Sequence, residues 1–309
     1  MTNALLAFCT ARLRKVKRFV KARFPLVRRR QLIRAENRQL TAIRELTWQA
    51  PRACEAVLVP VKPVAQHLTG EICLFVTFSN QPGLKNHVAN HIEQLLSAGV
   101  QVVLVVNTPN PQIPLAIETP LANKLTGIYV RANTGFDFAA WAHLLHLMPD
   151  TSGWKRLFLI NDSLVGPLDE EAFHKLILRI RNSDSDFLGL TQNLDPLWHL
   201  QSFFLVFNAS ALKHSFFSRY FERIVSLASK ESVINVYETK FTQALVDNGL
   251  RYEVLFPPGP GLPDFSNSTI KLWEQLLDAG FPYIKTSVVR ELGNNPRLLK
   301  RVPARFLDA

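Results

Sequence analysis

Hydrophobic and polar residues alternate in blocks along the middle of the chain, and the blocks switch between two spacings. Residues 71–79 are rich in β-branched and aromatic side chains, whereas residues 84–99 carry apolar residues at helical spacing and end on a glycine. The continuous apolar run 100–107 is typical of a strand that is covered on both faces. This alternation predicts an α/β fold with a mostly parallel sheet flanked by helices.

The same rhythm continues through the rest of the chain. Further strands are expected near residues 127–132, 156–161, 186–191, 199–208 and 251–256. Further helices are expected at about 137–147, 169–182, 209–228, 235–249 and 267–279. We expect one sheet to run through both halves, because a single sheet is more economical than two separate domains. A chain of 309 residues that is 47% hydrophobic can bury the core that such a sheet requires.

Charge is distributed very unevenly. Residues 1–50 contain 13 of the 36 Lys and Arg residues but only 2 of the 25 acidic residues, so the remaining 23 bases and 23 acids balance. We therefore divide the chain into a basic arm (1–50), a proline-containing linker (51–70), a globular domain (71–295) and a basic C-terminal tail (296–309). The net charge of +11 belongs to the arm, and the rest of the chain is neutral.

The arm has the pattern of a basic amphipathic helix. Leu13, Val16, Phe19 and Val20 recur at helical spacing among Lys and Arg, and Pro25 would break or kink that helix. Such a helix suits an anionic membrane surface. A solvated tail without a partner remains an alternative. Nucleic acid would attract the same charge, but a neutral domain offers no extended basic groove, so we expect no nucleic-acid partner.

The sequence lacks the signatures of several functional classes. There is no apolar run of 18 residues and no secretory signal pattern, and three widely spaced cysteines fit a reducing cytoplasm. P-loop, dinucleotide-binding and G-x-S-x-G motifs are also absent from the sequence. His87 and His91 have the spacing of a zinc protease motif, but Val88 stands where the general base glutamate would be. We interpret both histidines as helix-surface or core residues.

The most polar triplet of the central region follows its most apolar strand. In "LFLINDSLVGPL" (157–168), the strand runs directly into Asn161, Asp162 and Ser163. Ligands of parallel α/β sheets bind outside the carboxyl ends of the strands, so this triplet is a candidate site. It could instead cap the next helix, but Gly-Pro separates it from that helix and Asp169 is the better cap.

Two other stretches are open to a functional and a structural interpretation. In "RANTGFDFAAW" (131–141), a helix start after a strand could bind phosphate, with Asn133 and Asp137 nearby, or Asp137 could simply be the N-cap. In "VYETKFTQALVDNGL" (236–250), Glu238 lies near the predicted start of a helix, where a carboxylate could do no more than complement the helix dipole.

The motifs occur in an order that resembles the rhamnan synthesis protein F family, bacterial glycosyltransferase-like proteins of cell-wall and O-antigen polysaccharide assembly. The resemblance covers about residues 70–290 and leaves the arm outside. Its five elements are Asn133 to Trp141, Asn161 to Leu168, Leu200 to Phe207, Tyr237 to Thr242, and Gly280 to Lys285.

The resemblance implies a GT-A type, Rossmann-like fold and the transfer of a sugar from a nucleotide-sugar donor such as dTDP-rhamnose. The acceptor would be a lipid-linked glycan, such as a polyprenyl-linked one, or a cell-surface glycan. The protein would lie in the cytoplasm, peripheral to the inner membrane. A non-catalytic sugar-nucleotide or glycan-binding module of the same fold is the alternative. The donor-binding residues would be Thr77, Asn133, Asp137, Asn161, Asp162 and Ser163.

The remaining roles follow from the same resemblance. Glu238 would be the general base of an inverting transfer. Trp198, His199 and Gln201 are acceptor candidates, although a core or strand-edge role suits each of them equally. The GT-A pattern has a D-x-D that binds a divalent metal, whereas this chain has only Asp162 in the triplet. Mg²⁺ or Mn²⁺ at Asp162 is therefore a possible cofactor, because Mg²⁺ needs only one or two carboxylates beside substrate phosphates.

Overall fold

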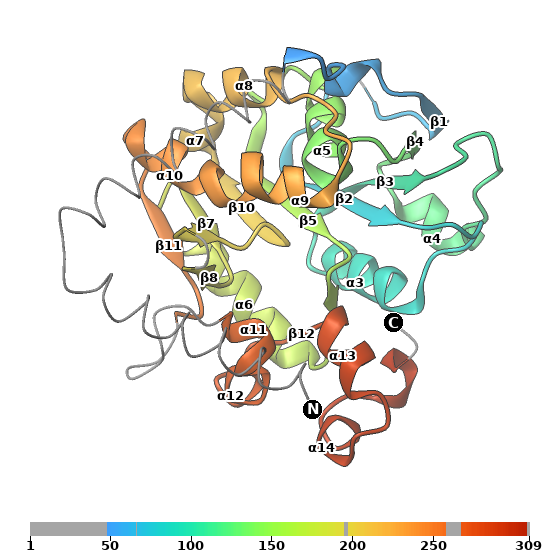
Figure 1. Cartoon of the computed structure of the whole chain (residues 1–309), viewed down its shortest axis with the longest axis vertical. Helices are drawn as coiled ribbons and strands as arrows, with labels where there is room; N and C mark the ends of the chain where they lie inside the picture. Colours follow the sequence, from blue (N-terminus) through green and yellow to red (C-terminus); the bar gives the residue numbers. More distant parts are fainter. Residues whose placement is uncertain (1–47, 66, 195–196, 258–266, 308–309) are drawn as a thin grey trace, which may run out of the picture. The chain divides into compact units, whose positions relative to one another are not determined.

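The computed structural model describes residues 48–65, 67–194, 197–257 and 267–307 (Figure 1). The chain divides into two units, Met1–Ala50 and Pro51–Ala309. The predicted amphipathic helix of the arm lies outside the described residues. No helix among the described residues is both long enough and apolar enough to cross a bilayer.

The second unit is built on a large mixed sheet. Its eight strands lie in the order β1 (Leu58–Lys62), β4 (Gly127–Ala132), β3 (Gln101–Thr108), β2 (Gly70–Phe78), β5 (Trp154–Asn161), β10 (Phe204–Asn208), β7 (Phe187–Gly189) and β11 (Tyr252–Val254). Strands β2, β3, β4 and β5 are mutually parallel, while β1 and β10 run antiparallel to their neighbours. The predicted class, a mostly parallel sheet flanked by helices, is confirmed.

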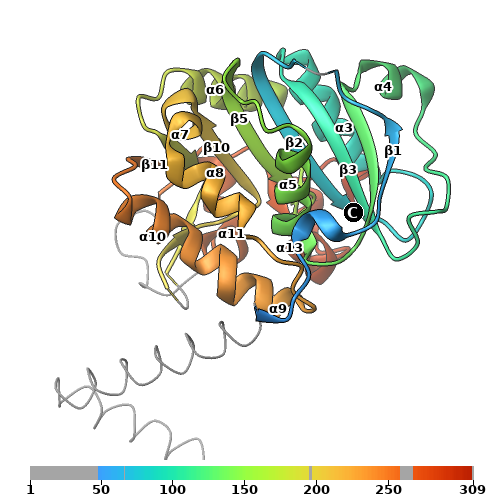
Figure 2. The ribbon, with the colours of Figure 1, turned by 90° about the horizontal axis from the view of Figure 1, so that it is seen from above.

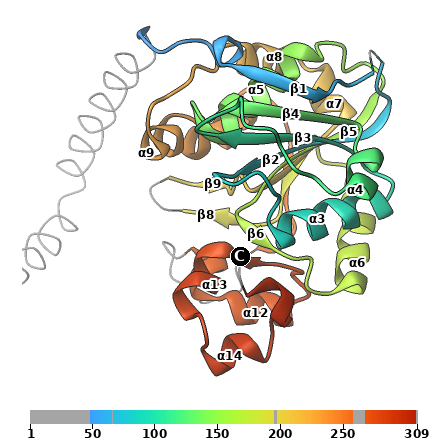
Figure 3. The same ribbon diagram turned by 90° about the vertical axis from the view of Figure 1, so that its right-hand side faces the viewer.

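Helices cover both faces of this sheet (Figure 2). One face carries α3 (Asn86–Ser97), α4 (Thr119–Lys124) and α6 (Glu170–Arg181). The other carries α5 (Phe136–Leu147), α7 (Ala209–Lys213), α8 (Ser215–Glu222) and α10 (Thr239–Asp247). Figure 3 shows the same three layers from the side. Strands covered on both faces explain why β2 and β3 are almost entirely buried and apolar.

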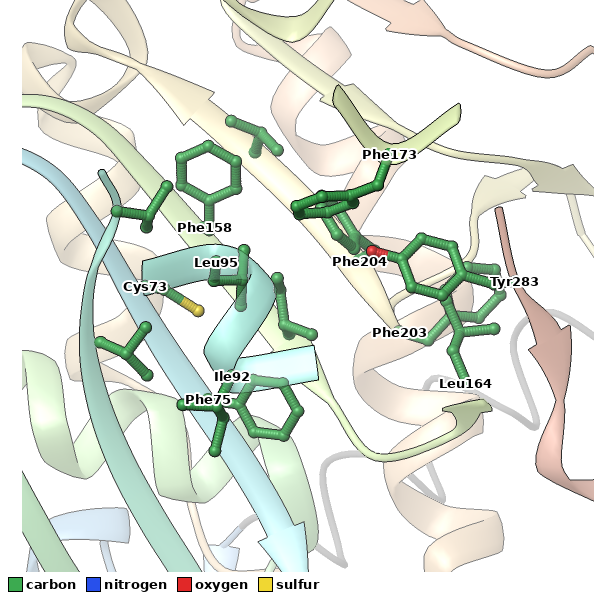
Figure 4. Packing of buried hydrophobic residues seen from close by; sticks show 14 of the residues in the cluster. Cys73, Phe75, Ile92, Leu95, Phe158, Leu164, Phe173, Phe203, Phe204 and Tyr283 are labelled. Atoms are coloured by element: carbon green, nitrogen blue, oxygen red, sulfur yellow. The ribbon is translucent and has the colours of Figure 1, made fainter. Parts of the chain in front are cut away.

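A large core cluster lies between the sheet and the α3 and α6 face (Figure 4). His91 is buried in this cluster, and its Nε2 lies 2.9 Å from the hydroxyl oxygen of Tyr283. Burial disfavours the charged imidazolium and lowers the pKa of His91 to about 3. His87 is buried as well, so of the two positions expected for this pair, helix surface or core, the structure shows the core.

Residues 51–70 do not form the irregular linker that the sequence predicts. It contains a 3-10 turn, η1 (Ala53–Glu55), and strand β1, which pairs antiparallel with β4. Pro60 suggested irregular structure, but a proline is tolerated in β1 because the strand lies at the edge of the sheet. The segment therefore completes the sheet.

Residues 296–309 do not form a separate basic tail either. It contains α14 (Pro296–Leu299) and η3 (Ala304–Phe306). Leu298, Val302 and Phe306 are buried in a second cluster that includes Val165 and Ile284. The basic residues that suggested a tail alternate with these apolar residues, which pack against the C-terminal elements (Figure 3). Those elements are α11 (Ser268–Lys271), α12 (Trp273–Asp278), β12 (Ile284–Lys285) and α13 (Thr286–Leu292).

Several predicted elements are divided in the structure. The strand expected at 199–208 forms β9 (His199–Leu200), which pairs with β8 (Gln192–Asn193), and then β10. The helix expected at 209–228 is broken at His214 into α7 and α8. The helix expected from residue 235 begins earlier, with α9 (Lys230–Val233), and passes through a π-helical turn, η2 (Ile234–Glu238), into α10.

Candidate functional site

The parallel strands end together at one edge of the sheet. The pairing register places Val76 beside Asn161, Thr77 beside Val106, and Thr108 beside Ala132. Strand β10 runs the opposite way, so it begins at this edge, where Phe204 pairs with Ile160. Thr77, Asn133 and the triplet 161–163 therefore lie at the edge where ligands of α/β sheets bind.

Asp162 is fixed by contacts to one of its two carboxylate oxygens. Its Oδ2 accepts hydrogen bonds from the Thr77 hydroxyl at 2.8 Å and from the Phe78 backbone N–H at 3.2 Å. The same oxygen lies 2.8 Å from the ammonium of Lys85, in an ion pair whose side chains are 35% and 20% exposed. The charge of Asp162 is thus compensated within the protein.

Asp137 and Asn161 form a second polar pair. The Asn161 side-chain amide donates to Oδ2 of Asp137 at 2.7 Å, and Asn161 Oδ1 accepts from the backbone N–H of Ser163 at 3.1 Å. Burial favours the neutral form of Asp137 and, with the nearby negative charge of Glu238, raises its pKa to about 6. The hydrogen bonds from Asn161 and from the Phe138 N–H oppose that rise only in part.

Asp137 is not the N-cap of α5. The helix begins at Phe136, and Gly135 occupies the cap position without a side-chain cap bond. The N-cap role considered for Asp137 is therefore wrong, and its side chain instead contacts Asn161 at the end of β5. The prediction for Asp169 is confirmed: its carboxylate accepts from the Ala172 N–H at 2.6 Å and caps α6.

The turn before α5 has an unusual backbone. Gly135 and Phe136 both have positive φ angles, of 71° and 56°, and this conformation is strained for a bulky residue. The carbonyl of Phe136 accepts a hydrogen bond from the Asn107 side-chain amide at 3.2 Å. A Cβ on Gly135 would lie 2.5 Å from the Ala139 Cβ and 2.7 Å from the Ser226 Cα. The close packing fixes the direction in which α5 presents Asp137.

Arg131 supports this turn from inside the protein, a role that the sequence did not reveal. Its guanidinium is completely buried and donates to the carbonyls of Ala132, Thr134 and Ala53 at 2.7 to 3.2 Å. Desolvation lowers the pKa of Arg131 to about 10. The only sequence signal was a charged residue at the end of an otherwise apolar strand.

Glu238 directly precedes α10, but its backbone is already helical, so it does not begin the helical segment as the sequence suggested. The helical segment begins after Ser229, whose hydroxyl accepts from the Ser232 N–H at 3.1 Å, and Glu238 closes the π turn η2 within it. A helix-dipole role therefore loses its basis, since the dipole acts within the first turn. Single π turns within helices are frequent at functional sites. Oε1 of Glu238 lies 3.4 Å from the Ser202 N–H, beside the start of β10.

Lys285 is a further charged residue at this edge that the sequence analysis left without a role. It lies on β12, which pairs with β6 (Leu164–Val165) directly after the triplet. Its ammonium lies 5.1 Å from the centroid of the Phe203 ring. Burial lowers the pKa of Lys285, and the negative charge of Glu238 opposes this effect. Its position at the end of the G-F-P-Y-I-K motif was the available signal.

Two of the three acceptor candidates are buried within the protein. His199 and Gln201 are buried, and Gln201 Oε1 accepts from the Thr191 hydroxyl at 2.7 Å. Trp198 is half-buried, donates to Gln192 Oε1 at 2.9 Å and packs against Tyr252 of the edge strand β11. These contacts favour a structural role for His199 and Gln201, and they place Trp198 toward the β11 edge of the sheet.

Comparison with known proteins identifies the family of this chain. The model of the family "Rhamnan synthesis protein F" matches residues 103–304, about two thirds of the chain. The chain belongs to the rhamnan synthesis protein F family. The predicted resemblance is thereby confirmed, and the matched region contains Asn133, Asp137, the triplet 161–163, Glu238 and Lys285.

Two curated proteins are similar to this rhamnan synthesis protein F member. It is 30% identical to "Uncharacterized protein y4gN" of Sinorhizobium fredii, over 63% of this chain and 51% of that protein. It is 26% identical to "Virulence protein VirA" of Vibrio anguillarum, over 65% of this chain and 73% of that protein. The chain thus spans about half the length of the first relative.

The residues around Asp162 do not fit a divalent metal site that the protein alone would build. Among the described residues, no group of three or more His, Cys, Asp or Glu side chains is placed to hold a metal ion. Oδ2 of Asp162 already accepts three donors, one of which is the ammonium of Lys85. A metal ion at this oxygen would have to displace the ammonium of Lys85, so the side chains present do not offer it a ready site.

Proposed function

We propose that this family member is a glycosyltransferase of the GT-A type. It would transfer rhamnose or a related sugar from a nucleotide-sugar donor such as dTDP-rhamnose to a lipid-linked or cell-surface glycan. Membership of the family supports a role in rhamnan synthesis. The observation that carries the proposal is the convergence of Asp137, Asn161 and Glu238 at the carboxyl edge of the parallel strands.

In the proposed reaction, the carboxylate of Glu238 accepts the proton of the acceptor hydroxyl. The hydroxyl oxygen forms a bond to the anomeric carbon, while the bond from that carbon to the diphosphate breaks and the diphosphate leaves with its electron pair. Attack from the opposite side inverts the anomeric configuration. Glu238 suits this role because it is half-buried and lies at the site edge, and because the structure shows no salt bridge to it among the described residues.

Donor binding would use the other polar residues of the edge. The Asn161 and Asp137 pair can orient hydroxyl groups of the nucleotide or the sugar, because carboxylate and amide groups bond well to hydroxyls. Thr77, through Asp162, and Ser163, through its N–H bond to Asn161, would hold this pair in place. Asn133, half-buried in the turn before α5, would line the same edge.

Turnover of nucleotide sugars tests the proposal directly. The full-length protein is incubated with dTDP-rhamnose and a panel of other nucleotide sugars, with and without membrane extract as a source of acceptor, and released nucleoside diphosphate is measured. We expect release that depends on the protein and on one donor. Donor binding without any release, in every acceptor condition, would identify a non-catalytic sugar-nucleotide-binding module instead.

A further inference from the structure

Asp162, the expected metal ligand, forms an ion pair with Lys85. Its Oδ2 accepts from Thr77, Phe78 and Lys85 at distances of 2.8 to 3.2 Å. A carboxylate oxygen has about two lone-pair sites, so three donors saturate this oxygen. The carboxylate therefore positions a cation of the protein's own, and that cation lies where an incomplete D-x-D would otherwise have to recruit a divalent ion.

The ammonium of Lys85 has donors to spare. Lys85 lies at the N-cap position of α3, with extended backbone, and its side chain reaches Asp162 across the edge of the sheet. An ammonium carries three N–H donors, and Asp162 accepts one of them. The side chain is 35% exposed, so the remaining donors can reach a ligand from solvent.

Lys285 approaches the same turn from a different element. The N–H and hydroxyl of the next residue, Thr286, both donate to the carbonyl of Ser163, at 3.0 and 3.2 Å. The ammonium of Lys285 lies over the ring of Phe203, and the carbonyl of Phe203 accepts from the Asn161 N–H at 3.1 Å. Both lysines therefore flank residues 161–163.

We propose that Lys85 and Lys285 bind the diphosphate of the donor and replace the divalent ion of a complete D-x-D. Diphosphate binding is then independent of metal, and the same two ammonium groups stabilise the charge that develops on the leaving diphosphate. This inference rests on the proposed function, because it assumes that the edge binds a nucleoside diphosphate group.

The first experiment compares binding with and without metal. Binding of dTDP, UDP and GDP to the full-length protein is measured by calorimetry in EDTA and in Mg²⁺ or Mn²⁺, and the tightest of the three serves as the probe. We expect the same affinity in all three conditions. A probe that binds only with a divalent ion would overturn the inference.

The second experiment tests the two lysines. We expect Lys85→Gln and Lys285→Gln each to weaken binding of the probe by about tenfold or more, since hydrogen bonds to charged groups contribute that much. Lys85→Arg should keep most of the affinity. Lys175→Gln is the matched control, because Lys175 lies on the exposed side of α6 in an i,i+4 pair with Glu171.

Binding of the corresponding nucleoside, which carries no phosphates, shows whether a lysine contacts the diphosphate or only supports the fold. A lysine that contacts the diphosphate should leave the affinity for the nucleoside unchanged, whereas a lysine that only supports the fold should weaken both ligands and lower the melting temperature. Unchanged probe affinity in Lys85→Gln would overturn the inference. Because Lys85 is partly exposed, this variant decides the matter even if Lys285→Gln does not fold.

The outcomes distinguish this inference from the proposed function. If the wild-type protein binds a nucleoside diphosphate only with metal, the donor site stands and the lysine assignment is wrong. If it binds none of the three diphosphates in any condition, the proposed function itself is wrong and the inference falls with it.

Discussion

Asp137 and Glu238 are two carboxylates whose negative charges interact at one edge of the sheet. The interaction contributes to the raised pKa of Asp137, which burial causes in the main. Two acidic groups in different environments can take different roles in one reaction. Asp137 is hydrogen-bonded to Asn161 and to its own helix, whereas Glu238 has one hydrogen-bond donor among the described residues, the Ser202 N–H at 3.4 Å. We propose Glu238 as the base because its carboxylate is freer to reach an acceptor hydroxyl.

Glu238→Gln should therefore cut turnover by at least about 100-fold, the lower range for loss of a general base. The amide keeps the shape of the side chain but cannot accept a proton at neutral pH, so donor affinity should stay near that of the wild type. Turnover and donor affinity are measured on the same variant. Glu231→Gln, an exposed acid in the first turn of α9, is the control. Near-normal turnover would remove Glu238 as the base and make Asp137 the next candidate.

The raised pKa of Asp137 predicts that the stability of the fold depends on pH. Its pKa is raised from 3.8 to about 6 in the folded protein, so its protonated form is favoured by folding. The stabilising contribution is fully present below about pH 4 and is lost as the pH rises through about 6. Asp137→Asn cannot titrate. The melting temperature of the wild type relative to this variant should therefore fall between pH 4 and pH 7.

Thermal unfolding of both proteins over this pH range checks the prediction. Subtracting the variant removes the contributions of the titrating groups that do not interact with Asp137, because both proteins share them. A difference in melting temperature that stays constant with pH would show that the pKa of Asp137 is the same in the folded and unfolded chains.

At the scale of elements, the turn between β4 and α5 decides where Asp137 points. Gly135 combines a positive φ with close packing, since an added Cβ would lie 2.7 Å from the backbone of Ser226. Gly249 has a similar φ of 86° at the end of α10 but nothing within 4 Å of an added Cβ. Alanine substitutions at the two glycines therefore distinguish the free-energy cost of the backbone conformation from the cost of the steric contact.

Gly249→Ala should lower the free energy of unfolding by roughly 1–2 kcal/mol, the cost of the left-handed conformation alone. Gly135→Ala should cost about 1–3 kcal/mol more, because the contact with Ser226 and Ala139 forces the packing apart. Denaturant unfolding of the two variants measures the difference. Equal losses would mean that the turn can shift freely, and Asp137 would then be less firmly held than the structure indicates.

At the scale of the whole molecule, the charge of the chain and the proposed site belong to different segments. The arm 1–50 carries the entire net charge, while the site lies in the unit Pro51–Ala309. A glycan built on a lipid carrier would be reached at a membrane surface, and a polybasic segment binds anionic lipid with about 1 kcal/mol per basic residue near the surface. We propose that the arm provides this attachment.

Deletion of residues 1–50 should abolish co-sedimentation with vesicles that contain anionic lipid, and it should leave the melting temperature of the remaining unit nearly unchanged. The unit Pro51–Ala309 is compact by itself, which supports the second expectation. Vesicles of neutral lipid serve as the control, and binding of the full chain should weaken with added salt. If the truncated protein sediments as before, the arm is not the membrane-binding segment.

The sequence by itself determined the elements whose signals are local. The alternation of strand and helix spacing predicted the sheet, because an apolar strand must be covered wherever it lies in the fold. It also located Asn161, Asp162 and Ser163 at a strand end, and Asp169 as a helix cap, since both depend on neighbouring residues. The order of five motifs was enough to predict the family.

Tertiary structure decided every feature that depends on distant residues. The pairing of Lys85 with Asp162 joins residues 77 positions apart, and the edge strand in 51–70 formed only because β4 offers a free edge. Glu238 was placed near a helix start because the apolar spacing does not show that the helix continues from its Ser229 cap through a π turn. Local spacing sets the periodicity of a segment, but only packing decides which charges meet.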